Sequence, residues 1–191
     1  MDKGGETSRE RILNAATAEF AAYGLAGARV DRIARAAECN KNLIYIYYEN
    51  KETLFTTVLQ KHLLRVYDEI PFSGEDLPGY AAATFDFAMA NPDVMRLLAW
   101  FALEQRAAHP EGRMAIHDVK VAAIAAAQEA GKVRTEFPPE FLVTAIMTLA
   151  TAWSAASPFG ATLDPESLRQ PEELRRRIGA AIASIAAPTD D

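Results

Sequence analysis

Helical patterning runs through almost the whole chain, and it constrains the fold more than any other feature. Alanine, the residue with the highest helix propensity, is the commonest residue. Apolar residues recur three and four positions apart, and no run of alternating β-branched residues is long enough for a strand. Proline and glycine, ten of each, separate the helical stretches. The sequence therefore predicts an all-α protein.

The charge distribution indicates two domains. Residues 1–65 hold 10 Lys and Arg against 8 Asp and Glu, whereas residues 66–191 hold 10 against 18. A mildly basic first third on an acidic remainder suggests a small DNA-facing unit attached to something else. We expect short helices over residues 8–55, with the fourth helix continuing to about residue 70, and a second helical domain over residues 71–191.

Several classes of protein do not fit the composition. A single cysteine, Cys39, excludes an internal disulfide framework and a multi-cysteine zinc site. The polar N-terminus and the lack of an eighteen-residue apolar stretch predict a cytoplasmic protein without a membrane partner. The three histidines have no further ligands at metal spacing, and neither G-x-S-x-G nor a phosphate-binding loop occurs. We therefore expect no enzymatic activity, no metal and no cofactor.

Residues 30–47 have the pattern of a helix-turn-helix, with a turn at residues 38–40 and a short second helix at residues 41–47. Helices at residues 8–23 and 50–70 would support it. The second helix carries groups that can bond base edges, and tyrosine hydroxyls and a lysine nearby can bind phosphate. The predicted DNA-binding residues are Asn40, Lys41, Asn42, Tyr45, Tyr47 and Lys51. An ordinary three-helix packing unit would show the same periodicity.

Separated segments agree in residue type and spacing with a known pattern. These segments are residues 12–16, Phe20, Tyr23-Gly24, residues 30–34, residues 43–48 and residues 51–55. Over residues 8–55, a little over a quarter of the chain, the sequence resembles the N-terminal domain of TetR-family transcriptional regulators.

The resemblance carries expectations for the whole molecule. It implies an all-helical homodimer with a small-molecule pocket in the C-terminal domain, whose last two long helices form a four-helix bundle with those of the partner. It implies that Lys41, Asn42 and Tyr45 meet bases or nearby phosphates, and that Tyr47 and Lys51 meet phosphates. Ligand binding in such proteins usually releases the DNA operator.

The chain departs from the family pattern at two positions. Glu38 stands in the turn where the family often has glycine, and only glycine adopts left-handed backbone angles at low cost. We therefore expect a turn that is strained or built differently. Ile46 stands between two tyrosines where the family often has a polar residue. Its side chain would either contact a thymine methyl or pack inward.

The C-terminal part offers candidates for a ligand pocket and for a dimer interface. Aromatic walls with a few polar groups are typical of small-molecule pockets, but the same residues can be ordinary core. The pocket candidates are Met89, Trp100, Phe101, Glu104, His117 and Met147. Glu104 could instead form an interhelix salt bridge, and His117 could be a core histidine.

Two strong apolar stripes on the last long helices suit a two-fold interface, although packing within the chain would also explain them. The interface candidates are Leu149, Trp153, Ile178 and Ile182. The sequence as a whole predicts a dimeric, DNA-binding repressor that a small-molecule effector releases. A helical interaction module that has lost specific DNA binding is the alternative.

Overall fold

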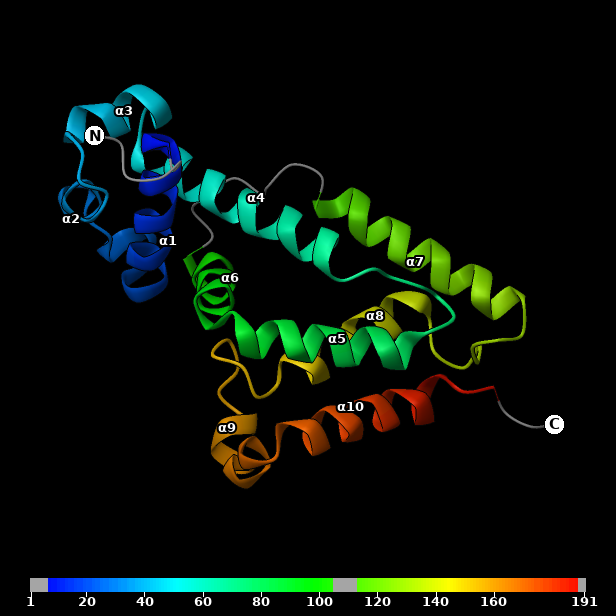
Figure 1. Ribbon diagram of the computed structural model, residues 1–191. Helices are drawn as coiled ribbons and strands as arrows, with labels where there is room; N and C mark the ends of the chain where they lie inside the picture. Colours follow the sequence, from blue (N-terminus) through cyan, green and yellow to red (C-terminus); the bar gives the residue numbers. More distant parts are fainter. Residues whose placement is uncertain (1–6, 105–112, 189–191) are drawn as a thin grey trace. The chain divides into compact units, whose positions relative to one another are not determined.

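The computed structural model describes residues 7–104 and 113–188 (Figure 1). Every regular element in these ranges is helical, which confirms the predicted fold class. None of these helices is long and apolar enough to span a membrane. The elements are α1 Ser8–Gly27, α2 Val30–Ala36, α3 Lys41–Tyr48, α4 Lys51–Glu69, α5 Leu77–Ala90, α6 Pro92–Glu104, α7 Arg113–Glu129, α8 Pro139–Thr151, α9 Gly160–Leu163, a 3-10 turn Pro165–Arg169 and α10 Pro171–Ala186.

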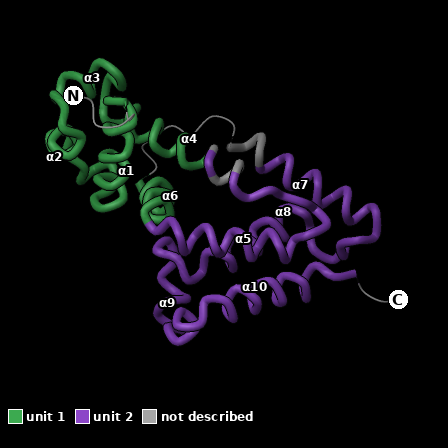
Figure 2. The backbone as a smooth tube through the Cα atoms, viewed as in Figure 1, with its two compact units in different colours: residues 1–64, 93–111 green, residues 65–92, 112–191 purple. Residues whose placement is uncertain are grey.

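The chain divides into two compact units (Figure 2). Unit 1 comprises residues 1–64 and 93–111, and unit 2 comprises residues 65–92 and 112–191. Helix α6 therefore belongs to unit 1, although the sequence analysis assigned it to the C-terminal domain. The boundary between the units falls within α4 rather than in the loop that follows it.

A capping box at Thr7 starts α1 at Ser8, the first residue of the predicted helix. The Thr7 hydroxyl accepts the Glu10 N–H at 3.3 Å, and the Glu10 carboxylate accepts the Thr7 N–H at 2.8 Å. These two bonds satisfy backbone donors that a helix N-terminus otherwise leaves open. The T-x-x-E spacing that makes them is visible in the sequence.

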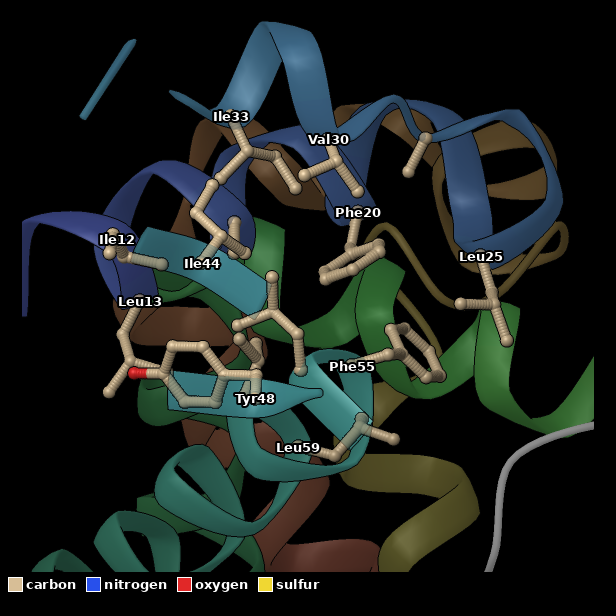
Figure 3. Packing of buried hydrophobic residues seen from close by; sticks show 14 of the residues in the cluster. Ile12, Leu13, Phe20, Leu25, Val30, Ile33, Ile44, Tyr48, Phe55 and Leu59 are labelled. Atoms are coloured by element: carbon tan, nitrogen blue, oxygen red, sulfur yellow. The ribbon is translucent and has the colours of Figure 1, made fainter. Parts of the chain in front are cut away.

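The core of unit 1 gathers the inner faces of its helices (Figure 3). Phe20 of α1 packs edge-to-face against Phe55 of α4, with ring centroids 5.0 Å apart. Ile44 and Tyr48 bring α3 into the same cluster. The side chains with no exposed surface also include Ile12, Ile33, Leu54 and Leu97. Because Leu97 lies on α6, this helix is part of the core behind the helix-turn-helix.

A kink at Gly24 changes the predicted end of α1. The helix was expected to stop at Tyr23, but after Gly24 (φ 65°, ψ −178°) one further turn continues to Gly27. A Cβ on Gly24 would lie 2.4 Å from Glu104 Oε1 and 2.8 Å from the Trp100 ring. Left-handed φ and close approach by α6 both require glycine here.

Unit 2 is arranged around α5, which packs against α8 and α10, while α7 and α10 also contact α8. Between α8 and α10 the chain forms the short helix α9 and the 3-10 turn. Trp153 Nε1 donates to the Asp164 carbonyl at 3.2 Å, and the Asp164 side chain caps the turn by accepting the Ser167 N–H. These contacts order a segment whose sequence shows no helical period.

Candidate nucleic-acid interface

The turn between α2 and α3 sets where α3 begins. The Cys39 N–H donates to the Ala34 carbonyl at 3.0 Å and closes the end of α2. Glu38 adopts φ 50°, in the left-handed region that glycine enters at low cost. The turn therefore has the left-handed geometry typical of glycine, and Glu38 adopts it with backbone strain. Asn40 then caps α3, since its Oδ1 accepts the Asn42 N–H at 2.9 Å.

Helix α3 has one buried face and one exposed face. Ile44 and Tyr48 are buried and hold the helix against α1 and α4, as Figure 3 shows. The exposed residues are Asn42, Tyr45, Ile46 and Tyr47, the last three with exposed fractions of 41%, 74% and 44%. The structure thus excludes the inward packing of Ile46 that the sequence left open. Three of the six predicted DNA-contacting side chains, Asn42, Tyr45 and Tyr47, lie on this free face.

Lys41, at the start of α3, is held by an ion pair. Its ammonium lies 2.9 Å from Asp31 Oδ1 of α2, and both side chains are exposed. The hydrogen bond to Asp31 raises the pKa of Lys41. The pair links the two helices of the motif and fixes the position of the cation. Because both side chains are exposed, solvent screens the pair, and it contributes little to stability.

Lys51, at the start of α4, contacts backbone rather than lying free. Its Nζ donates to the Ala28 carbonyl at 3.1 Å and lies 3.5 Å from the Ala26 carbonyl. Asn50 caps the helix, because its Oδ1 accepts the Thr53 N–H at 2.8 Å. The ammonium therefore ties the connection between α1 and α2 to α4. An ammonium carries three donors, so these contacts leave room for a phosphate.

A largely buried ion pair fixes α2 on α1. Glu19 is 8% exposed, and its carboxylate accepts from Arg32 Nε at 2.8 Å and from the Arg29 N–H, also at 2.8 Å. Burial acts to raise the pKa of Glu19, but the hydrogen bonds from Arg32 and Arg29 outweigh it and lower the pKa. The Arg32 guanidinium also lies 4.1 Å from the centroid of the Tyr23 ring. The sequence pattern does not reveal this pair, since charged residues thirteen apart give no periodic signal.

Comparisons with known proteins agree with this geometry. Residues 12–58 match the family model "Bacterial regulatory proteins, tetR family", and residues 76–183 match "Tetracyclin repressor-like, C-terminal domain". The HTH-type transcriptional repressor SCO4008 of Streptomyces coelicolor is 38% identical over 156 residues, covering 80% of this chain and 81% of the relative. The chain belongs to the TetR family.

Two further relatives support the same assignment. The HTH-type transcriptional repressor NicS of Pseudomonas putida is 26% identical over 149 residues, covering 73% of this chain and 70% of the relative. The crystal structure of SCO4942 from S. coelicolor, assigned as a transcriptional regulator, superposes with a TM-score of 0.84 at 29% identity. It covers 96% of this chain and 100% of that one. This TetR-family chain is a DNA-binding transcriptional regulator.

The structure separates the pocket candidates into two groups. Trp100, Phe101 and Glu104 lie in unit 1, where Trp100 Nε1 donates to the Ala21 carbonyl at 3.3 Å and Phe101 is in the core. The Glu104 carboxylate accepts the Ala26 N–H at 3.1 Å. These three residues therefore pack on α1, and the salt bridge considered for Glu104 is replaced by a bond to backbone.

The other pocket candidates lie in unit 2 but not at one point. Met147 lies on α8, with its sulfur 3.8 Å from the Tyr80 hydroxyl. Met89 is exposed on α5. His117 on α7 is partly exposed, and its Nδ1 lies 3.7 Å from the carboxylate of its neighbour Asp118.

The dimer candidates also divide. Leu149 and Trp153 are partly exposed, whereas Ile178 and Ile182 are 2% and 1% exposed. Both isoleucines are buried within unit 2, where α10 packs against α5 and α8, so they have almost no surface left for a partner. The expectation that Ile178 and Ile182 form a dimer surface is therefore corrected, and the intrachain alternative holds for them.

Proposed function

We propose that this TetR-family regulator is a homodimeric repressor whose α3 helices read a two-fold symmetric operator and whose small-molecule effector releases the DNA. The observation that carries the DNA-binding part is the free face of α3. An α-helix fits the major groove, and residues near its N-terminus are those that meet base edges. Asn40, Lys41, Asn42, Tyr45, Tyr47 and Lys51 are the proposed contacts.

Selection of random-sequence duplexes on the full-length protein tests this proposal. A dimer should enrich a palindromic sequence, because operator symmetry mirrors protein symmetry. Asn42→Ala should alter the enriched sequence, since asparagine can bond adenine at two points. If no sequence is enriched, the chain is the helical interaction module considered as the alternative.

We place the dimer surface on the exposed faces of α8 and α10, which lie side by side in unit 2. Small or mildly polar residues are among those exposed on these helices, beside the exposed Phe141 and Arg177, and they allow close approach of a second pair of helices. They include Thr144, Thr148, Ala180, Ala181 and Ser184. Leu149 and Trp153, partly exposed on and after α8, lie beside them in the sequence and stay in the proposed interface.

Hydrodynamic mass tests the dimer surface with a matched pair of variants. Ala181→Glu places a charge in the proposed interface, and Ala126→Glu places one on exposed α7. We expect the wild type and Ala126→Glu to be dimers and Ala181→Glu to shift toward monomer. A monomeric wild type, or two variants that behave alike, contradicts this surface.

We place the effector site beside Tyr80 of α5. Its hydroxyl is hydrogen-bonded to the Lys120 ammonium of α7, which also lies 5.5 Å from the Phe72 ring centroid. Burial raises the pKa of Tyr80 and lowers that of Lys120. Aromatic walls with few polar groups are typical of small-molecule sites. Compounds that release the wild-type protein from its selected duplex should release the Tyr80→Phe variant less well. If a compound releases both proteins equally, the effector site lies elsewhere.

A further inference from the structure

Ile46 is the most exposed residue of α3 that carries a large apolar side chain, at 74% exposure. A single exposed isoleucine on a protein surface needs no explanation. Here, however, it follows Asn42 and Tyr45 at the spacing that places all three on one side of the helix. Both of those residues are also exposed. An apolar group thus stands within the face that the proposed function turns toward DNA.

Local structure holds Ile46 outward. Ile44 and Tyr48 are buried at 2% exposure, so α3 cannot rotate Ile46 inward without exposing them. The Asn40 cap and the Lys41–Asp31 pair fix the start of the same helix. The outward position is therefore a property of the folded unit.

The two lysines proposed to contact DNA also bond groups within the protein. Lys41 bonds Asp31, and Lys51 bonds the Ala28 carbonyl. Ile46 therefore adds an apolar contact to the hydrogen-bonding groups that Asn42 and Tyr45 offer to bases on the same face. In unmodified DNA, the C5-methyl of thymine is the apolar group that base pairs present in the major groove.

We propose that Ile46 is a specificity-determining residue that selects thymine by packing against its C5-methyl in each operator half-site. This inference rests on the proposed function, and it goes further by naming the base feature that is read. Removing the methyl changes no hydrogen-bonding group, so its effect can be measured separately from backbone contacts.

The probe is the duplex enriched by the full-length wild-type protein, with each thymine of a half-site replaced in turn by deoxyuridine. The proteins are wild type, Ile46→Ala and, as a matched control, Leu163→Ala, which truncates a 79% exposed leucine on α9. We expect one position where deoxyuridine weakens wild-type binding about fourfold per half-site, the value for burial of one methyl. Ile46→Ala should lose this sensitivity, and Leu163→Ala should keep it.

Two results would overturn the inference, and one of them would overturn the proposed function as well. An enriched duplex in which no thymine methyl has an effect that depends on Ile46 overturns the inference alone. Absence of any enriched duplex overturns the proposed function and this inference with it. Since Ile46 is exposed, loss of folding in Ile46→Ala is not expected, and its thermal unfolding should match the wild type.

Discussion

Glu38 shows how a single residue can conflict with the backbone it occupies. Its φ of 50° lies in the region where a side chain crowds the following carbonyl. The hydrogen bonds at the ends of α2 and α3 keep the chain there, because Cys39 and Asn40 satisfy the neighbouring backbone groups. The departure from glycine was visible in the sequence. That the chain would keep the left-handed turn was not, since this depends on how α2 and α3 pack.

Replacing Glu38 by glycine should therefore stabilise the protein. We expect Glu38→Gly to raise the free energy of unfolding by roughly 1 kcal/mol, because relief of left-handed strain exceeds the added entropy of the unfolded chain. Glu38→Ala keeps a Cβ and should give no such gain. Urea unfolding of both variants decides this, and equal stability of the two would remove the strain argument.

Lys51 is predicted to contact phosphate from its place at the start of α4. Lys51→Ala should weaken binding to all DNA sequences about equally and lower the salt slope by roughly one contact. Lys61→Ala, which removes an exposed lysine later in α4, is the control and should leave the slope unchanged. Should the slope of Lys51→Ala equal that of wild type, the ammonium serves only to hold the Ala28 carbonyl.

At the scale of elements, the junction of α1 and α6 shows what sequence patterns cannot specify. Trp100 and Phe101 follow Leu97 by three and four residues, and this spacing predicts a buried face of the helix without naming the element that covers it. The structure packs both on unit 1. The same limit applies to Ile178 and Ile182, where the stripe was predicted correctly but its partner, α5, was not.

Gly24 tests the closeness of this junction. Gly24→Ala should destabilise the protein by about 3 kcal/mol, since the new Cβ adds steric overlap with Glu104 and Trp100 to left-handed strain. Gly131→Ala is a matched control, because Gly131 has φ 70° with no atom within 4 Å of a built Cβ. It should cost about 1 kcal/mol. If the two variants cost the same in urea unfolding, α6 does not crowd Gly24.

The ion pair of Glu19 with Arg32, between α1 and α2, predicts that the stability of the protein depends on pH. The folded-state pKa of Glu19 is lowered, so its contribution is present above the unfolded value near 4.5 and is lost as pH falls through the folded value. Glu19→Gln should lower the free energy of unfolding by about 2 kcal/mol at pH 7. The difference in the free energy of unfolding between the wild type and this variant should shrink below pH 4.5. A difference that stays constant from pH 7 to pH 3 would contradict this origin.

At the scale of the whole molecule, the sequence predicted the helical class, the helix-turn-helix and the basic first third, because periodicity, capping residues and charge are local properties. It did not predict that α6 belongs to unit 1 or that the segment 157–170 is helical in part. The first depends on contacts between residues distant in sequence, such as Glu104 with Ala26, and the second on side-chain bonds such as that of Trp153 to the Asp164 carbonyl. The acidic balance of residues 66–191 also agrees with a DNA-binding face confined to unit 1.

The central claim is that two copies of the chain bind one operator through α3. Fluorescence anisotropy of the full-length protein on DNA from upstream of its own gene, compared with random DNA at several salt concentrations, tests it most directly. The account predicts tighter binding to the upstream DNA, saturation at two chains per site and a steep decline with salt. Absence of binding to either DNA, even at low salt, would contradict it.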